Sequence, residues 1–310
     1  MMLVAMALDL ALGWPKALFK RIGHPVTWLG ALIEALESRL NREGTNRRAR
    51  GLLTALLVTG IAAGIGAIAQ ALLPEGWLGL VIGGALAWPL VALRSMHDHV
   101  MRVTKPLIAG DLTGARHAVA MIVGRDPKQL DTAGVARAAL ESLAENSSDG
   151  IVAPLFWGAL LGLPGIAAYK AINTLDSMIG HRNARYEAFG WAAARIDDGA
   201  NLLPARLTGV LFALASGGRA KDAFRVMLRD AKAHRSPNAG WPESALAGAL
   251  GIRLSGPRHY GDRVAQEPWL NGAAPDPGAH DLARGLALFR RAMGLGAVLL
   301  VLVALAIWGM

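Results

Sequence analysis

The chain has 310 residues, of which 53% are hydrophobic and 18% charged. This composition is typical of an integral membrane protein. The absence of cysteine excludes disulfides, thiolate metal sites and covalent thiol chemistry. The net charge of +9 lies mostly outside the apolar runs, and no basic patch interleaved with aromatic residues is present. Orientation in the membrane and attraction to anionic lipid therefore explain this charge better than nucleic-acid binding.

The N-terminal segment is apolar but lacks the features of a cleavable signal peptide. Asp9 interrupts the first dozen residues, no Lys or Arg precedes them, and Trp14-Pro15 stands where small residues would mark a cleavage site. Further along, Gly23-His24-Pro25 leads into residues 27–40, whose apolar positions recur with helical spacing. We expect an amphipathic helix here that lies on the membrane surface or packs on the soluble face.

Three uncharged apolar runs predict membrane-spanning helices at residues 51–73, 77–93 and 294–309. At about 1.5 Å per residue these runs can cross roughly 30 Å of hydrocarbon, with local thinning of the bilayer for the shorter ones. Many Lys and Arg side chains lie between residues 14 and 50, whereas only Pro74-Glu75-Gly76 separates the first two runs. The positive-inside rule therefore places residues 14–50 and the region after Leu93 in the cytoplasm.

The remaining segments read as polar helical regions and two shorter apolar stretches. Helices are predicted at 94–104, 111–123, 132–143, 220–233 and 243–250, and a long loop at 256–278, with no persuasive strand pattern. Pro154, Pro164 and Gly165 predict that residues 151–169 form a broken or re-entrant segment rather than one straight span. Residues 202–216 are short and apolar, and we expect them to enter the membrane without crossing it. The predicted fold is an all-α polytopic membrane protein with about three to five membrane helices in one domain, residues 1–310.

A dense polar run surrounds the apolar segment 151–169. Glu145 and Asp149 are four residues apart, a spacing that suits two carboxylates on one helix face and a shared Mg²⁺, although helix capping or a solvated face explains such a pair equally well. Further acids and amides are joined by basic residues that could hold phosphate oxygens. An internal salt-bridge network is the alternative. The candidate residues are Glu145, Asn146, Asp149, Lys170, Asn173, Asp176, His181, Arg182, Arg185, Arg195, Asp197 and Asp198.

Two features limit the chemistry of this run. No Gly-x-x-x-x-Gly-Lys-Ser/Thr loop occurs in the chain, so an ATP site would have to be of another type. His181 taken alone is more often a neutral structural histidine than a base or ligand. From the residues alone, the sequence predicts a polytopic helical protein with a polar site that could bind phosphate.

At these residues the chain resembles the membrane-bound adenosylcobinamide-phosphate synthases of cobalamin biosynthesis, the CobD/CbiB family. The resemblance covers nearly the whole chain in order. It is carried by Gly23-His24-Pro25-Val26, Glu145-Asn146 through Asp149-Gly150, Tyr169 through Met178, Ala194-Arg195-Ile196-Asp197-Asp198, Pro204-Ala205-Arg206-Leu207-Thr208 and Ser236-Pro237-Asn238-Ala239-Gly240-Trp241-Pro242-Glu243. Two positions depart from the family pattern. Trp14 stands where an acid usually precedes Pro15, and His181 stands where Tyr is more common.

The resemblance implies an ATP-dependent ligase that joins (R)-1-amino-2-propanol phosphate to the free propionate carboxylate of adenosylcobyric acid. It further implies Mg²⁺ with ATP, a location in the bacterial inner membrane with the site facing the cytoplasm, and association with other enzymes of the pathway. A membrane sensor related to the family and a small-molecule transporter are the alternatives. From the chemistry of the side chains we assign roles within such a ligase as a hypothesis. Mg²⁺ is assigned to Glu145, Asp149, Asp176 and Asp197, with Asp198 as a spare acid or orienting group. Binding of the phosphates of ATP or of the amino alcohol is assigned to Lys170, Arg182, Arg185 and Arg195, orientation of substrate amides or proton acceptance to Asn146, Asn173 and His181, and completion of the substrate pocket to Ser236, Asn238 and Glu243.

Overall fold

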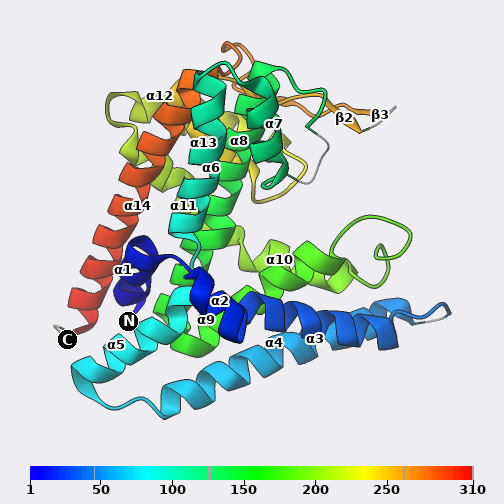
Figure 1. Ribbon diagram of the computed structural model, residues 1–310, viewed down its shortest axis with the longest axis vertical. Coiled ribbons are helices and arrows are strands. Elements are labelled where there is room, and N and C mark those ends of the chain that lie inside the picture. Colours follow the sequence, from blue (N-terminus) through cyan, green and yellow to red (C-terminus); the bar gives the residue numbers. More distant parts are fainter. Residues whose placement is uncertain (45, 124–126, 261–262, 309–310) are drawn as a thin grey trace. The chain divides into compact units, whose positions relative to one another are not determined.

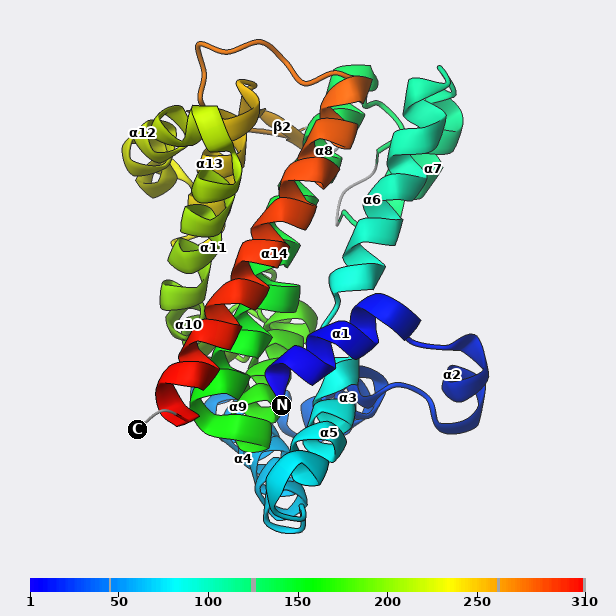
Figure 2. The same cartoon turned by 90° about the vertical axis from the view of Figure 1, so that its left-hand side faces the viewer.

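A computed structural model describes residues 1–44, 46–123, 127–260 and 263–308, and most of these are α-helical (Figures 1 and 2). The helical stretches long and apolar enough to cross a membrane are Arg47–Ala71, Gly76–Ile108, Thr132–Ile179 and Ala279–Ala306. A further candidate within the described residues is the pair Met2–Leu12 and Lys16–Leu40, which is bent by 111°. The predicted all-α polytopic fold is therefore confirmed, and the protein is a multi-pass membrane protein.

The chain forms two compact units, and each takes residues from two separate parts of the sequence. The first comprises residues 1–93 and 149–201, and the second comprises residues 94–148 and 202–310. The first unit contains α1 (Met2–Leu12), α2 (Lys16–Ile22), α3 (Pro25–Leu40), α4 (Arg47–Ala71), α5 (Gly76–Ala87), the 3₁₀ turn η1 (Trp88–Leu90), α9 (Ala153–Ile179) and α10 (Trp191–Ala200). The π turn η2 (Ser148–Val152) leads into α9.

The core of the first unit lies where α3, α4, α9 and α10 meet. Its buried side chains include Ile33 of α3, Val58 of α4 and Leu175 of α9. α3 and α4 run side by side (Figure 1). The helix predicted at residues 27–40 is confirmed by α3, which starts at Pro25 because His24 accepts a hydrogen bond from the main-chain N–H of Val26.

Glycines let α4 lie close to its neighbours. A Cβ at Gly51 would collide with the carbonyl group of Phe189, and one at Gly66 would collide with the backbone of Leu163. Both collisions involve main-chain atoms, which cannot rotate out of the way as a flexible side chain can. Gly60, in contrast, has open space around its Cβ position.

α9 is broken in its first half. Gly162 has a φ of 70° and a ψ of −148°, so the helix cannot continue through it, and Pro164 follows two residues later. The N–H of Leu163 donates to Oε1 of Gln70 on α4 at 2.8 Å, which supplies a partner for a backbone group released by the break. The predicted break within residues 151–169 is confirmed, although the whole stretch Thr132–Ile179 is also long enough to span a membrane.

The second unit is built mainly from helices. They are α6 (Leu93–Ile108, whose first residue belongs to the first unit), α7 (Leu112–Ala120), α8 (Thr132–Ser147), α11 (Leu202–Ala215), the turn η3 (Gly217–Arg219), α12 (Ala220–Asp230), the turn η4 (Ala231–Ala233), α13 (Gly240–Leu250) and α14 (Ala279–Trp308). Figure 2 shows α12 and α13 side by side, in agreement with their many mutual contacts. α11 has 14 residues, fewer than any spanning candidate, as expected for residues 202–216.

Short strands lie within, and just before, residues 256–278, for which the sequence predicted only a loop. β1 (Leu254–Ser255) pairs antiparallel with β4 (Trp269–Leu270), and β2 (Arg258–Tyr260) pairs antiparallel with β3 (Arg263–Ala265). The expectation of no strand was therefore wrong. Strands of two or three residues are too short to show the alternating pattern by which a strand is recognised.

Two arginines and one aspartate hold this segment to α8. Arg253 donates to both carboxylate oxygens of Asp276, at 2.9 and 2.6 Å, and Arg137 of α8 also pairs with Asp276. Both guanidinium groups lie against the ring of Trp269. The Cζ atom of Arg137 is 4.7 Å from the ring centroid, and that of Arg253 is 4.3 Å from it. These contacts join α8, β4 and the loop before α14.

The glycine contacts of α4 predict opposite effects for two similar substitutions. Gly51→Ala should lower the midpoint of thermal unfolding in detergent, because overpacking against a backbone costs about 1–3 kcal/mol or more. Gly60→Ala on the same helix should leave the midpoint unchanged or raise it slightly, because alanine favours a helix by roughly 1 kcal/mol. Equal midpoints for the two variants would contradict the close packing at Gly51.

Asp276 predicts a specific pH dependence of stability. The hydrogen bonds from Arg253, with the charge of Arg137, hold the pKa of Asp276 below its usual value. A carboxyl group with a lowered pKa in the folded state adds stability above its unfolded pKa of about 3.9, and this stability is lost as pH falls through the folded pKa. Asp276→Asn should therefore lower the unfolding midpoint at pH 7 and reduce its decline below about pH 4. Parallel curves for wild type and variant between pH 3 and 7 would contradict this assignment.

Candidate functional site

The first unit holds most of the predicted site residues. They are Asp149 in η2, Lys170, Asn173 and Asp176 on α9, His181, Arg182 and Arg185 in the loop that follows, and Arg195, Asp197 and Asp198 on α10. Lys170, Asn173 and Asp176 recur every three residues, so the helical turn of α9 places neighbouring members close to one another. The remaining predicted residues, Glu145, Asn146, Ser236, Asn238 and Glu243, belong to the second unit.

A buried tyrosine lies at the centre of the polar residues in the first unit. The hydroxyl of Tyr169, a residue that is 1% exposed, lies 3.1 Å from the main-chain oxygen of Asp149 and 2.9 Å from Oδ1 of Asn201. The Nδ2 group of Asn201 donates to Oδ2 of Asp197 at 3.0 Å. This chain of contacts connects η2, α9 and α10, so it fixes the positions of the elements that carry the candidate carboxylates.

Opposite charges are arranged around this tyrosine. Asp149, Asp176 and Asp197 all lie close enough to Tyr169 to interact with it electrostatically, and Lys170 interacts in the same way with Asp149. We call the following set the polar cluster. It comprises Asp149, Tyr169, Lys170, Asp176, His181, Arg195, Asp197, Asp198 and Asn201.

The C-terminal end of α9 joins the cluster to α10. Asp176 interacts electrostatically with Asp198, His181 and Arg195. Arg195 and Asp198 form an ion pair of 3.0 Å between Nη2 and Oδ2. Gly180 leaves room for the Asp176 carboxylate, because a Cβ at position 180 would collide with it. The cluster therefore brings together acids, which could bind a cation or accept a proton, and bases, which could neutralise phosphate.

The carboxylates do not form a complete metal site by themselves. Within residues 1–44, 46–123, 127–260 and 263–308, no group of three or more His, Asp or Glu side chains could hold a metal ion. Mg²⁺ in phosphate-using enzymes is commonly bound by one or two carboxylates together with substrate phosphates and water. The donor set around Tyr169 fits that mode of binding, and the assignment of individual ligands stays a prediction.

The loop between α9 and α10 is attached to α3 by a bidentate ion pair. Arg185 donates from Nε and Nη2 to the two oxygens of Glu37, at 3.0 and 2.8 Å. Asn41 donates to Glu37 and to the main-chain oxygen of Arg185, which also accepts from Arg47. The Arg185 guanidinium, predicted to bind phosphate, thus also has a positioning role for the loop that carries His181.

The predicted residues of the second unit occupy two places. Glu145 and Asn146 are exposed at the end of α8. Ser236 accepts hydrogen bonds from the main-chain N–H groups of Asn238 and Ala239, just before α13. Glu243 of α13 is 2% exposed and lies 3.7 Å from Nε2 of His234, which is also buried. These contacts give Ser236 and Glu243 clear structural roles, and they leave their predicted contact with substrate untested.

Sequence reasoning missed three residues that the structure connects to the site. Tyr169 lay within a family motif but had no assigned role, and Asn201 and Glu37 were not considered as site residues. Asn201 follows Asp197 by four residues at the end of a helix, a spacing that places both side chains on one face. Glu37 could not be found this way, because its partner Arg185 is 148 residues away in the chain.

The ion pair with Glu37 predicts a measurable cost for its removal. Arg185→Ala should lower the midpoint of thermal unfolding, but by less than the loss of a fully buried ion pair would, because the Arg185 side chain is 65% exposed while that of Glu37 is 6% exposed. Arg185→Ala should also increase proteolytic cleavage within residues 180–190, as measured by limited proteolysis and mass spectrometry. Arg42→Ala removes an exposed arginine after α3 and serves as the control. Equal cleavage in both variants would contradict the positioning role.

Comparison with known proteins agrees with this arrangement of motifs. The CobD/Cbib protein family matches residues 2–289. The cobalamin biosynthesis protein CobD of Rhodobacter capsulatus is 70% identical over 308 residues, which cover 99% of this chain and 98% of that protein. The proteins of the same name from a Sinorhizobium species and Brucella suis are each 47% identical, over 92% and 94% of this chain and 92% of each relative. No solved structure shows significant similarity. The chain therefore belongs to the CobD/CbiB family.

Proposed function

We propose that this protein acts in cobalamin biosynthesis as an adenosylcobinamide-phosphate synthase. It would form an amide between the amine of (R)-1-amino-2-propanol phosphate and the free propionate carboxylate of adenosylcobyric acid, with ATP as co-substrate. Family membership and the name of relatives that match nearly the whole chain support the pathway. The observation that supports the chemistry is the polar cluster, in which three of the four aspartates interact with one buried tyrosine, while Lys170 and Arg195 interact with aspartates of the cluster.

ATP is needed because a carboxylate is a poor electrophile. In the proposed reaction a carboxylate oxygen attacks the γ-phosphorus of ATP. The bond between this phosphorus and the β,γ-bridging oxygen breaks, so that ADP leaves and the substrate carboxylate becomes an acyl phosphate. The neutral amine then attacks the acyl carbon, inorganic phosphate leaves with the former carboxylate oxygen, and the amine gives up one proton to a base. Such a site needs cations for the phosphoryl oxygens and a proton acceptor for the amine.

The first unit supplies both kinds of group. Lys170 and Arg195 are the cations of the polar cluster, and Arg182 is exposed in the loop after His181. They would neutralise the phosphates of ATP or of the amino alcohol. His181 and Asp198, which both interact with Asp176, are candidates for proton acceptance and for orienting the amine.

Mg²⁺ would supply charge neutralisation on the ATP oxygens when bound. One or two of Asp149, Asp176 and Asp197 would hold it together with ATP oxygens and water, and Glu145 remains in the set that the sequence suggests. Tyr169 and Asn201 would keep Asp197 oriented through the hydrogen bond of 3.0 Å between Asn201 and Asp197. Because ATP is a cytoplasmic substrate and the basic segment 14–50 favours the cytoplasmic side, we place the site at the cytoplasmic face of the inner membrane.

The proposal predicts an ATP-dependent increase in the mass of the corrinoid. Detergent-purified protein with adenosylcobyric acid, aminopropanol phosphate and Mg-ATP should yield a product heavier by the amine minus water, together with one equivalent of inorganic phosphate. Omission of ATP or chelation of Mg²⁺ should abolish both signals. Corrinoid binding by folded protein without a mass change would instead favour a sensor or a transporter.

The polar cluster predicts which carboxylates matter for this reaction. Asp176→Asn and Asp197→Asn should each lower kcat by about 10²-fold or more, as is typical when a charge-stabilising or proton-accepting group is lost. Asp222→Asn removes an acid of α12 that pairs with Arg225, and it serves as the control with unchanged kcat. Full activity in both cluster variants, with intact folding, would contradict the site assignment.

A further inference from the structure

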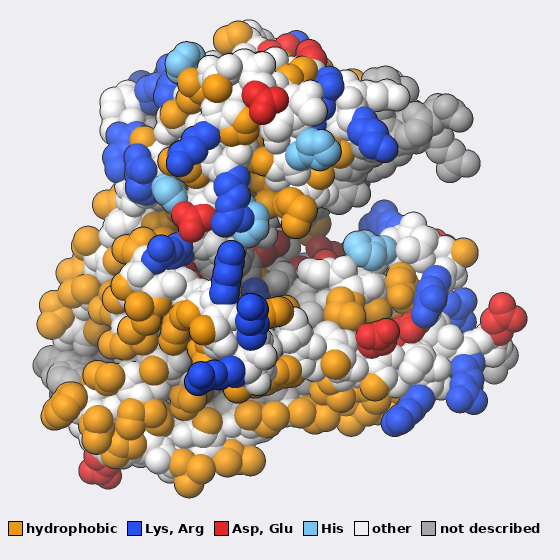
Figure 3. All heavy atoms as spheres, viewed as in Figure 1, with side chains coloured by type: hydrophobic (Ala, Val, Ile, Leu, Met, Phe, Trp, Pro, Cys, Tyr) orange, Lys and Arg blue, Asp and Glu red, His pale blue; other side chains and the backbone are white. Residues whose placement is uncertain are grey.

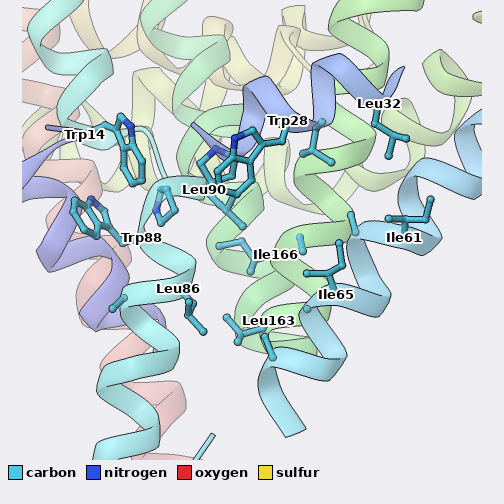
Figure 4. Close-up of a pocket in the computed structure, with 18 of the residues that line it drawn as sticks. Trp14, Trp28, Leu32, Ile61, Ile65, Leu86, Trp88, Leu90, Leu163 and Ile166 are labelled. Carbon is cyan, nitrogen blue, oxygen red and sulfur yellow. The ribbon is translucent and has the colours of Figure 1, made fainter. Parts of the chain in front are cut away.

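An apolar pocket lies in the first unit. Its volume is about 490 Å³, within the range of roughly 300–1,000 Å³ of small-molecule sites. Side chains of α2, α3, α4, α5, η1 and α9 line it, and Figure 4 shows those of Trp14, Trp28 and Trp88 around it. No polar-cluster residue is among its lining residues.

The uncharged lining of the pocket favours a hydrocarbon ligand over a polar one. None of the described residues that line the pocket carries a charge. Two of its indole N–H groups are already used within the protein, since Trp14 donates to the main-chain oxygen of Gly23 and Trp28 to that of Ile22. A nucleotide or an amino alcohol phosphate would lose its hydration here and gain few hydrogen bonds in return. An alkyl chain makes no hydrogen bonds to water, so it would lose none on entering the pocket.

The walls of the pocket belong to membrane-spanning candidates. α4, α5 and α9 fall within such stretches, and Ile61, Ile65 and Leu86 line the pocket while remaining 44%, 64% and 49% exposed. The pocket surface therefore continues into apolar surface of the kind that faces lipid in a multi-pass protein. A lipid molecule could enter from the bilayer without crossing water.

A basic helix borders the pocket. α2 contributes Leu18 to the lining, and its Lys16, Lys20 and Arg21 are all exposed, with no acidic residue in the helix. Lys and Arg side chains gather over α2 above the hydrophobic surface of α4 (Figure 3). Tryptophan and basic residues together are typical of the level of the lipid headgroups. This arrangement complements a molecule with an apolar tail and an anionic head.

We propose that the pocket binds one acyl chain of an anionic phospholipid, with the lipid phosphate next to Lys16, Lys20 and Arg21 of α2. The occupant is a bilayer lipid rather than a substrate of the ligation, so the proposal does not depend on the proposed function. The bound chain would fill the space between α2, α3 and the helices α4, α5 and α9.

Native mass spectrometry of the full-length protein tests the pocket. Delipidated protein in detergent is incubated with phosphatidylglycerol or with phosphatidylcholine of the same acyl chains, and bound lipid is counted. Ala85→Phe fills the pocket from an exposed lining position, and Ala67→Phe places the same side chain at an exposed position outside it. We expect one tightly bound phosphatidylglycerol in wild type and Ala67→Phe, and about tenfold weaker binding in Ala85→Phe. Equal binding by the two variants would overturn the proposal.

The basic rim is tested by the preference between the two lipids. Lys16→Gln with Lys20→Gln should reduce the preference for phosphatidylglycerol by about tenfold or more, since each basic residue near a headgroup contributes roughly 1 kcal/mol. Lys221→Gln with Lys232→Gln removes two exposed charges of the second unit and should leave the preference intact. Equal affinity of wild type for both lipids, or an equal loss in both double variants, would overturn the role of α2.

Discussion

The close packing of α4 on α9 is the constraint on which the rest of the first unit depends. Gly66 allows the two backbones to approach at Leu163, and Gln70 supplies a hydrogen bond to the N–H group that the break at Gly162 releases. In hydrocarbon an unpaired backbone group costs several kcal/mol, so a broken helix persists only where a neighbour satisfies it. α4 therefore stabilises the irregular helix that carries Lys170, Asn173 and Asp176.

The need to pair polar groups also applies to the charged side chains of the polar cluster. Charged groups in or near a membrane are expensive unless they are paired or hydrogen-bonded. Tyr169 and Asn201 link Asp149 and Asp197, while Arg195 pairs with Asp198. A network of this kind keeps carboxylates and cations side by side before any substrate binds. In the proposed ligation, such preorganised charges would stabilise the phosphoryl-transfer transition state, because they need little rearrangement during the reaction.

The polar cluster and the apolar pocket of the first unit use different side chains. The polar cluster uses η2, α9, the loop after it, and α10 with Asn201 at its end, whereas the apolar pocket uses Trp14, α2 to α5, η1 and the part of α9 just after its break. α9 contributes to both, since the pocket-lining residues Leu163, Ile166 and Ala167 and the cluster residues of this helix all follow its break at Gly162. A lipid held in the pocket would thus contact the helix that carries the candidate catalytic residues.

The sequence by itself determined the all-α membrane fold, most helix positions and the family. These depend on hydrophobic length, helical periodicity and ordered motifs, all of which are local properties of the chain. The tertiary structure alone decided that Glu37 pairs with Arg185, that Gln70 contacts Leu163 and that residues 254–270 contain paired strands. It also revealed that Asn201 joins Tyr169 to Asp197. Such contacts join residues distant in the chain, and helix packing brings them together in a way that periodicity cannot express.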